Sequence, residues 1–158
     1  MNLNNENIRE NLKKRLELEL GLPLTPRSSK QVDNAFNGDC ILVENFPIKS
    51  INKLKIGNNI LKPCDYIIGD SEGIIYLKKI YAGFLYLEYI YGLDESEFSP
   101  LLDLMVEYET DVSWNKDVTS IHENNVSVNY DSNLSKGALI QSMISDLKAK
   151  YSVVVEMI

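Results

Sequence analysis

Apolar residues near the N-terminus recur at a spacing of four, which places them on one face of an α-helix. Within residues 5–21 they are Ile8, Leu12, Leu16 and Leu20. Gly21 favours the left-handed conformation that ends a helix, and Pro23 cannot continue one. The pattern predicts an amphipathic N-terminal helix over 5–21. Residues 22–39 carry two prolines and an Asn-Gly pair, and we interpret most of them as connection.

The hydrophobic pattern changes in residues 40–92, where short apolar runs alternate with turn residues. This pattern is typical of antiparallel strands joined by reversals. The expected strands are 41–44, 51–56, a third beginning at Ile60, 66–68, 74–77 and 84–91. In 84–91 both alternating sets of side chains are largely apolar. We therefore expect a helix to cover one face of that strand, and a sheet, loop or neighbouring chain to cover the other.

Helical spacing returns after Gly92. The first stripe consists of Leu101, Leu104, Met105, Tyr108 and Val112. Ser99 can cap this helix, and Pro100 suits its first position. The stripe of a last helix, over about 134–151, consists of Leu139, Ile140, Met143, Ile144 and Leu147. The pattern predicts C-terminal helices within 99–152, followed by an apolar, β-branched tail at 153–158.

These elements define the expected fold class. With 158 residues, the chain has the size of one domain and can bury roughly 70% of its unfolded surface. We predict an α+β fold in a single domain, 1–158. A helical bundle, formed by the N-terminal helix and two or more C-terminal helices, would carry a central antiparallel β-rich insertion over 40–92.

Charge is unevenly distributed along the chain, whose formal net charge is −7. Residues 93–131 contain 10 acidic and 1 basic side chains, whereas 49–92 contain 4 acidic and 6 basic ones. The acidic region will not hold nucleic acid, because affinity for phosphate depends on Lys and Arg. It is either a solvated helix face with acidic loops or a surface that faces a charged partner.

Few residues are suited to catalysis. The chain has one histidine, His122, and two cysteines, Cys40 and Cys64. A nucleophilic thiol with His122 as base would also need a group that orients the base, and no motif indicates one. We interpret the cysteines as small buried hydrophobic side chains and His122 as a loop residue. Phosphate-binding glycine strings and a calcium loop are absent from the sequence, so we expect no enzyme activity, no cofactor and no metal.

The chain begins with polar and charged residues and contains no apolar stretch near the ~20 residues of a membrane span. We expect a protein that is soluble in the cell that makes it and has no membrane partner. Five tyrosines in the β-rich region fit either sheet packing or a protein interface. They are Tyr76, Tyr81, Tyr86, Tyr89 and Tyr91.

Several phrases, in this order of elements, resemble the head-tail connector (neck adaptor) proteins of tailed viruses. The phrases that resemble a β insertion of this family are Phe46-Pro47-Ile48-Lys49-Ser50-Ile51, Leu54-Lys55-Ile56-Gly57-Asn58-Asn59-Ile60-Leu61, Asp65-Tyr66-Ile67-Ile68 and Gly73-Ile74-Ile75-Tyr76-Leu77. In such chains an aromatic strand ending in Tyr-x-x-Gly, here 89–92, leads into the first C-terminal helix. A serine-rich stretch, here 120–132, precedes the last one. The resemblance covers about residues 6–152.

The resemblance implies a structural protein of the virion neck, made in the host cytoplasm. Copies of the chain would form a ring, a dodecamer in many members, under the portal protein. The ring would extend the DNA channel, let DNA pass without specific binding, and dock the next neck or tail completion protein.

Three groups of residues are candidates for these contacts. The portal-binding tail would comprise Val153, Val154, Val155, Met157 and Ile158. An acidic surface between subunits or toward the lumen would comprise Asp94, Glu95, Glu97, Glu107, Glu109 and Asp111. Its basic complement would comprise Lys53, Lys55, Lys78 and Lys79. A closed ring joins two different faces of each subunit, which such a charge pair suits. The alternatives are a small acidic monomeric adaptor or inhibitor that binds a basic host or toxin protein, and an enzyme that uses Cys40 or Cys64.

Overall fold

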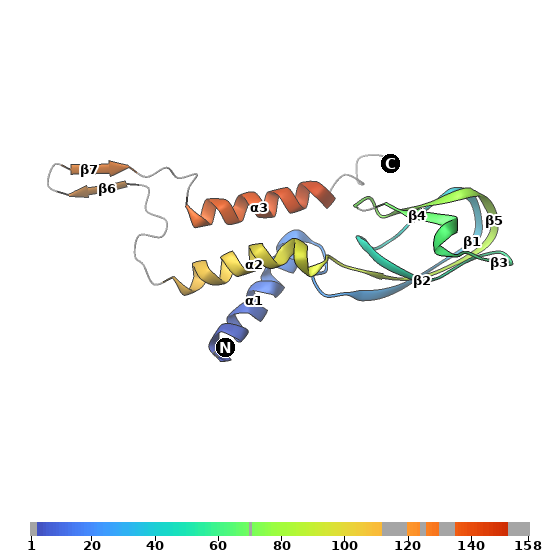
Figure 1. The fold of residues 1–158 in the computed structure, drawn as a ribbon, viewed down its shortest axis with the longest axis horizontal. Helices are drawn as coiled ribbons and strands as arrows, with labels where there is room; N and C mark the ends of the chain where they lie inside the picture. The colour runs from blue at the N-terminus through green and yellow to red at the C-terminus, as the bar shows by residue number, and fades with distance from the viewer. Residues whose placement is uncertain (1–2, 70, 112–119, 124–125, 130–134, 152–158) are drawn as a thin grey trace. The chain divides into compact units, whose positions relative to one another are not determined.

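The computed structural model describes residues 3–69, 71–111, 120–123, 126–129 and 135–151. The expected α+β class is confirmed, with helices toward both ends of the chain and an antiparallel sheet between them in sequence (Figure 1). The chain divides into two compact units, where the sequence predicts one domain. The helical unit comprises 1–21 and 96–149, and the sheet unit comprises 22–95 and 150–158.

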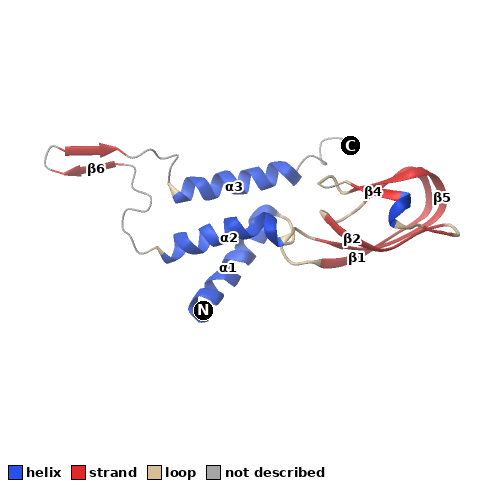
Figure 2. Ribbon diagram, in the orientation of Figure 1, coloured by secondary structure: helices blue, strands red, loops and turns tan. Residues whose placement is uncertain are grey.

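Three helices build the helical unit: α1 (Leu3–Leu20), α2 (Glu95–Thr110) and α3 (Lys136–Tyr151). A two-stranded hairpin, β6 (Ser120–Glu123) with β7 (Val126–Asn129), stands between α2 and α3 in the sequence (Figure 2). The predicted first and last helices are confirmed. The hydroxyl oxygen of Ser135 caps α3 by accepting a hydrogen bond of 3.0 Å from the backbone N–H of Ala138. His122, interpreted as a loop residue, lies in β6.

The buried face of α2 differs from the predicted stripe. Its buried side chains are Phe98, Leu101, Leu102 and Met105, a regular i, i+3, i+4, i+7 pattern. Leu104, expected in the core, is only half-buried. The prediction that the helix begins around Pro100 is also wrong, because α2 begins five residues earlier and holds that proline within it. The earlier start brings Phe98 into the stripe and rotates its centre toward Leu102.

Five antiparallel strands build the sheet of the sheet unit: β1 (Arg27–Leu42), β2 (Ile48–Ile56), β3 (Asn59–Ile60), β4 (Tyr66–Ile68) and β5 (Ile74–Tyr91). A short 3₁₀ helix, η1 (Pro63–Asp65), precedes β4. The order is β1-β5-β2-β3, and β4 pairs with the first part of β5. The expected strands 51–56 and 66–68 are confirmed. The long strand β5 organises the sheet, because β1, β2 and β4 all pair with it.

Residues 27–39, interpreted as connection, belong to strand β1, so that prediction is wrong. The strand is largely polar and exposed and shows little alternation. Its conformation follows from pairing with β5, which runs from Arg27 opposite Tyr91 to Leu42 opposite Ile74. Long-range pairing of this kind overrides a weak local preference.

The predicted strands 74–77 and 84–91 are two parts of the single strand β5. Gly83 lies between them with a φ of 129°, a conformation that residues with a Cβ rarely adopt. A Cβ at this position would also stand 3.0 Å from the Cα of Gly57. Position 83 therefore requires glycine for two reasons: the backbone angle, and the close approach of Gly57 in the β2–β3 turn.

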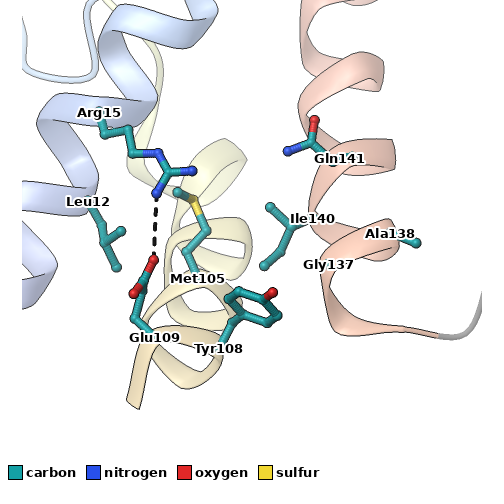
Figure 3. Close-up of a pocket in the computed structure, with 9 residues that line it drawn as sticks. All are labelled: Leu12, Arg15, Met105, Tyr108, Glu109, Gly137, Ala138, Ile140 and Gln141. Atoms are coloured by element: carbon teal, nitrogen blue, oxygen red, sulfur yellow. Dashed lines mark ion pairs between the residues drawn. The ribbon is translucent and has the colours of Figure 1, made fainter. Parts of the chain in front are cut away.

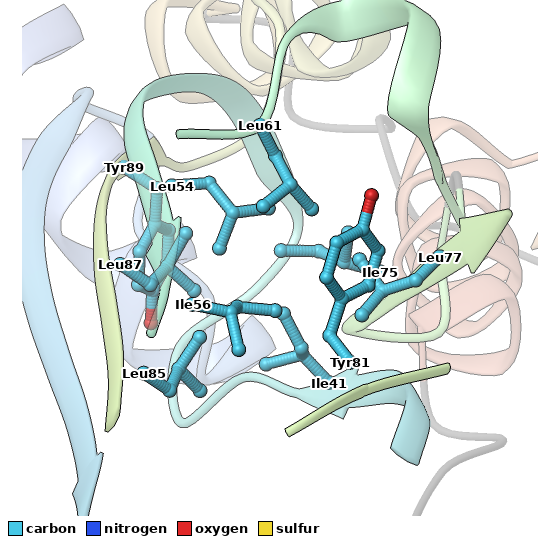
Figure 4. Packing of buried hydrophobic residues seen from close by; sticks show 10 residues of the cluster. All are labelled: Ile41, Leu54, Ile56, Leu61, Ile75, Leu77, Tyr81, Leu85, Leu87 and Tyr89. Atoms are coloured by element: carbon cyan, nitrogen blue, oxygen red, sulfur yellow. The ribbon is translucent and has the colours of Figure 1, made fainter. Parts of the chain in front are cut away.

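The curved sheet encloses its own core. Ten buried side chains form one apolar cluster and point into the interior of the sheet unit (Figure 4). They are Ile41, Leu54, Ile56, Leu61, Ile75, Leu77, Tyr81, Leu85, Leu87 and Tyr89. The hydroxyl oxygen of Tyr89, a fully buried residue, accepts a hydrogen bond of 3.1 Å from the backbone N–H of Asn45. On the opposite face Phe84 is 45% exposed, so the described chain does not cover that face completely, and cover by a neighbouring chain, one of the expected alternatives, stays a prediction.

Candidate functional site

The strand β5 divides its side chains between two faces. Most residues at odd positions, such as Leu85 and Leu87, are buried, whereas Tyr76, Ile80 and Phe84 at even positions are exposed. Residues opposite one another in an antiparallel pair point to the same face of the sheet. The register therefore assigns residues of the neighbouring strands to either the buried or the exposed face.

The exposed face carries an unusual number of apolar side chains. Val32 of β1 stands opposite Tyr86, and Ile67 of β4 stands opposite Tyr76. Ile60 of β3 pairs with Lys55, which itself stands opposite Tyr86. We call this surface the outer sheet face, and its exposed large apolar residues are Val32, Leu42, Ile60, Ile67, Tyr76, Ile80 and Phe84.

Basic side chains border these apolar groups. Of the predicted basic complement, Lys53, Lys55 and Lys78 lie at positions of the outer sheet face. The Nζ of Lys53 lies 5.6 Å from the centroid of the Tyr86 ring, a cation–π distance. Lys79 instead has its Nζ 5.1 Å from the ring centroid of Tyr81, which belongs to the core cluster. Three of the four predicted lysines therefore lie on the outer sheet face.

A further lysine of this face was not predicted. Lys30 of β1 stands opposite Glu88, and its Nζ lies 3.9 Å from the Glu88 carboxylate. Lys53 faces the same glutamate from β2. Lys30 was missed because its segment was interpreted as connection. The sequence held only a weak signal for a strand here: Ser28, Lys30 and Val32 alternate with Ser29 and Gln31, which stand opposite buried residues of β5.

Most of the predicted acidic surface is occupied by ion pairs within the chain. Glu107 and Asp111 of α2 lie 2.7 Å and 3.7 Å from the Nζ of Lys136 at the start of α3. Glu109 lies 3.6 Å from a guanidinium nitrogen of Arg15 in α1. An ion pair between Arg9 and Asp103 also links α1 to α2.

The pKa of Lys136 is consistent with its ion pairs to Glu107 and Asp111. The pKa of Lys136 is raised, first by its hydrogen bond to Glu107 and further by the negative charges of Glu107 and Asp111. Within the sheet unit, Asp94 lies 2.8 Å from the Nζ of Lys49. Exposed ion pairs contribute little stability each, so their main effect here is to orient the helices. Glu95 is exposed and Glu97 is half-buried.

An open groove of about 300 Å³ lies among the three helices (Figure 3). Its lining consists of Leu12, Arg15, Met105, Tyr108, Glu109, Gly137, Ala138, Ile140 and Gln141. The ion pair between Arg15 and Glu109 crosses one side of it. Its described lining contains no thiol or imidazole, and its one carboxylate is paired with arginine. The groove therefore offers side-chain packing rather than a nucleophile or a general base.

The cysteines are placed differently from the prediction. Cys40 and Cys64 are both exposed and unbridged, so their interpretation as buried hydrophobic side chains is wrong. Cys40 stands opposite Tyr76 and therefore lies on the outer sheet face, whereas Cys64 belongs to η1. Exposure follows from the register of Cys40, since the side chain next to it, that of Ile41, takes the buried position.

One ionisable group of the outer sheet face has a defined partner. The hydroxyl of Tyr76 donates a hydrogen bond of 2.6 Å to the carboxylate of Glu72. This bond, followed by partial burial and the negative charge of Glu72, raises the pKa of the Tyr76 phenol.

No group of three or more His, Cys, Asp or Glu side chains in the described part of the chain could hold a metal ion. No helix among the described residues is long and apolar enough to cross a membrane. The predicted portal-binding tail, 153–158, lies outside the described residues.

Six chains of solved structures match this chain. Neither a protein-family model nor a curated protein matches the sequence. The chain is similar to a chain in the neck of a native GTA particle computed with C12 symmetry, with 12% identity, coverage of 90% of this chain and 82% of that chain, and a TM-score of 0.45. It is also similar to a chain in the neck of an empty GTA particle computed with C6 symmetry, with 11% identity, coverage of 85% and 74%, and a TM-score of 0.42.

Proposed function

We propose that this chain is a structural head-tail connector of a tailed virus, located in the virion neck. In this role it forms a ring, a dodecamer, under the portal protein, extends the DNA channel and docks the next neck or tail protein. The observation that carries the proposal is the arrangement of its elements. The N-terminal helix and the C-terminal helices belong to one compact unit, and the chain between them forms a second unit, a sheet. This is the order that the sequence resemblance implies.

The chemistry of the surfaces supports a binding role. The groove among the helices offers no reactive group, and the described side chains form no metal cluster. The outer sheet face instead presents apolar and basic side chains to solvent. Large exposed apolar surfaces mark protein interaction sites. A subunit of a closed ring needs two different binding faces, because its contacts are heterologous.

Charge supports passage of DNA through such a ring. The helical unit contains 13 acidic and 7 basic side chains, and the sheet unit contains 10 acidic and 9 basic ones. A negative surface toward the lumen repels the DNA phosphates and thus prevents specific binding. We place this surface on the helical unit. The apolar tail, 153–158, is proposed to contact the portal, by adding a strand or by wedging between its elements.

The test is a mass measurement in solution. The full chain is mixed with the portal ring of the virus that encodes it, and the mass of the complex is measured by native mass spectrometry. The expected product contains many copies of the chain on one portal ring. A defined one-to-one complex with a basic protein, together with no binding to the portal, would instead establish the small acidic adaptor or inhibitor. As a check on catalysis, a Cys40→Ser, Cys64→Ser double variant is expected to assemble like the natural chain.

A further inference from the structure

The outer sheet face holds most of the exposed apolar side chains of the described structure. Among the described residues, nine large hydrophobic side chains are exposed, and seven of them lie on the outer sheet face with exposures between 42% and 71%. The other two, Leu18 and Leu139, lie on α1 and α3. Random scatter would not collect these side chains on one side of one sheet, so the face needs an explanation of its own.

The area of the face is that of an interface. Aromatic side chains have about 150–250 Å² each and aliphatic ones less, so these seven side chains at roughly half exposure present roughly 500 Å² to solvent in total. The largest apolar patch of a typical monomer measures about 300–600 Å². A standard protein interface buries about 800 Å² on each partner. The seven apolar side chains and the lysines that border them together approach that size.

The chemistry of the face selects a protein rather than a nucleic acid. Nucleic acid is bound by Lys and Arg at its phosphates and, for single strands, by aromatic rings on which bases stack, whereas most of the exposed large side chains of this face are aliphatic and would stay uncovered by such a ligand. The ring of Tyr86 is already engaged by Lys53. Four lysines lie on the face, Lys30, Lys53, Lys55 and Lys78, against two acids, Glu88 and the Glu72 that accepts the hydrogen bond of Tyr76. The partner is therefore apolar with a negative border.

The helical unit of this chain is the unit with a clear excess of negative charge. The helical unit has an excess of six acidic side chains, whereas the sheet unit has an excess of one. Two outer sheet faces would repel each other, because their lysines carry the same charge. A sheet against a helical unit is attractive and heterologous, which is the contact that closes a ring.

We infer that the outer sheet face binds the helical unit of the next copy of this chain. The inference rests on the proposed function, which supplies the ring, and names the contact between its subunits. Each copy then uses its sheet unit toward one neighbour and its helical unit toward the other.

Cys40 allows a direct test, because it is an exposed thiol on this face, and Cys64 is an exposed thiol on η1. Both are labelled with a maleimide in the free chain and in the assembled ring, and the rates are compared by peptide mass spectrometry. We expect assembly to slow labelling of Cys40 about tenfold or more relative to Cys64, since modification requires an accessible thiol. An assembled ring in which Cys40 reacts at the rate of the free chain overturns the inference and leaves the proposed function intact.

Variants provide an independent arm. Ile80→Glu and Phe84→Glu place an acid on the outer sheet face, at side chains that are 71% and 45% exposed, so the fold is expected to persist by circular dichroism. Both should abolish ring formation. Asn58→Glu, at the exposed turn between β2 and β3, is the matched control and should assemble normally. Normal assembly of both face variants, or equal loss in the control, overturns the inference. If the natural chain forms no multi-copy species even with the portal, the proposed function itself fails, and the inference fails with it.

Discussion

The packing of α2 gives the sharpest test of the structure, through a comparison of two leucines. Leu102 is 1% exposed and Leu104 is half-buried. The stripe predicted from the sequence includes Leu104 and leaves Leu102 out. Leu102→Ala removes three buried carbon atoms, worth about 2–2.5 kcal/mol in transfer free energy. The cavity left behind raises the cost to about 3–4 kcal/mol. Leu104→Ala should cost about 1 kcal/mol, because its side chain is already partly solvated.

Urea unfolding followed by the helical circular dichroism signal measures the difference. With an m-value of about 1–3 kcal/mol per molar, Leu102→Ala should lower the midpoint by about 1 M or more, and Leu104→Ala by much less. The m-values should agree between variants, so that the midpoints compare stability alone. If Leu104→Ala destabilises as much as Leu102→Ala, the rotation of α2 described above is wrong and the sequence stripe is right.

Three further predictions concern the tail, the bend of β5 and a tyrosine. Deletion of 153–158 should leave the circular dichroism spectrum unchanged and abolish binding to the portal in a sedimentation assay; undiminished binding would remove the tail from the proposal. Gly83→Ala should lower the unfolding free energy by about 1–3 kcal/mol, because of its positive φ and the approach to Gly57; a neutral result in thermal unfolding would contradict the strain. Because the pKa of Tyr76 is raised, its link to Glu72 stabilises the fold below the ordinary phenol pKa and is lost as the pH rises through the raised value. Ultraviolet titration should show Tyr76 ionising at lower pH in a Glu72→Gln variant, and an unchanged titration would refute this.

The sequence was informative where local pattern and final environment agree. The helix over 3–20 has a regular apolar spacing and a glycine after its end, the strand 66–68 is a short apolar run followed by turn residues, and both were predicted closely. Strand β1 was not, because its side chains are mostly polar and its conformation depends on pairing with residues about fifty positions away. Contacts of that separation leave no trace in a local window. The burial of Cys40 was misjudged for the same reason, since only the register of β1 determines which face it joins.

The two apolar faces of residues 84–91 have different surroundings in the structure. Residues 84–91 are apolar on both alternating faces, and such a strand requires cover on both sides. The curvature of the sheet covers the side of Leu85, Leu87 and Tyr89, which are almost fully buried. On the other side Phe84 remains exposed, as do Val32 of β1 and Ile60 of β3. Apolar area left in water costs free energy in proportion to its size, about 25 cal/mol per Å². The cover for this second side is therefore expected from another molecule, and a neighbouring chain was among the covers that the pattern left open.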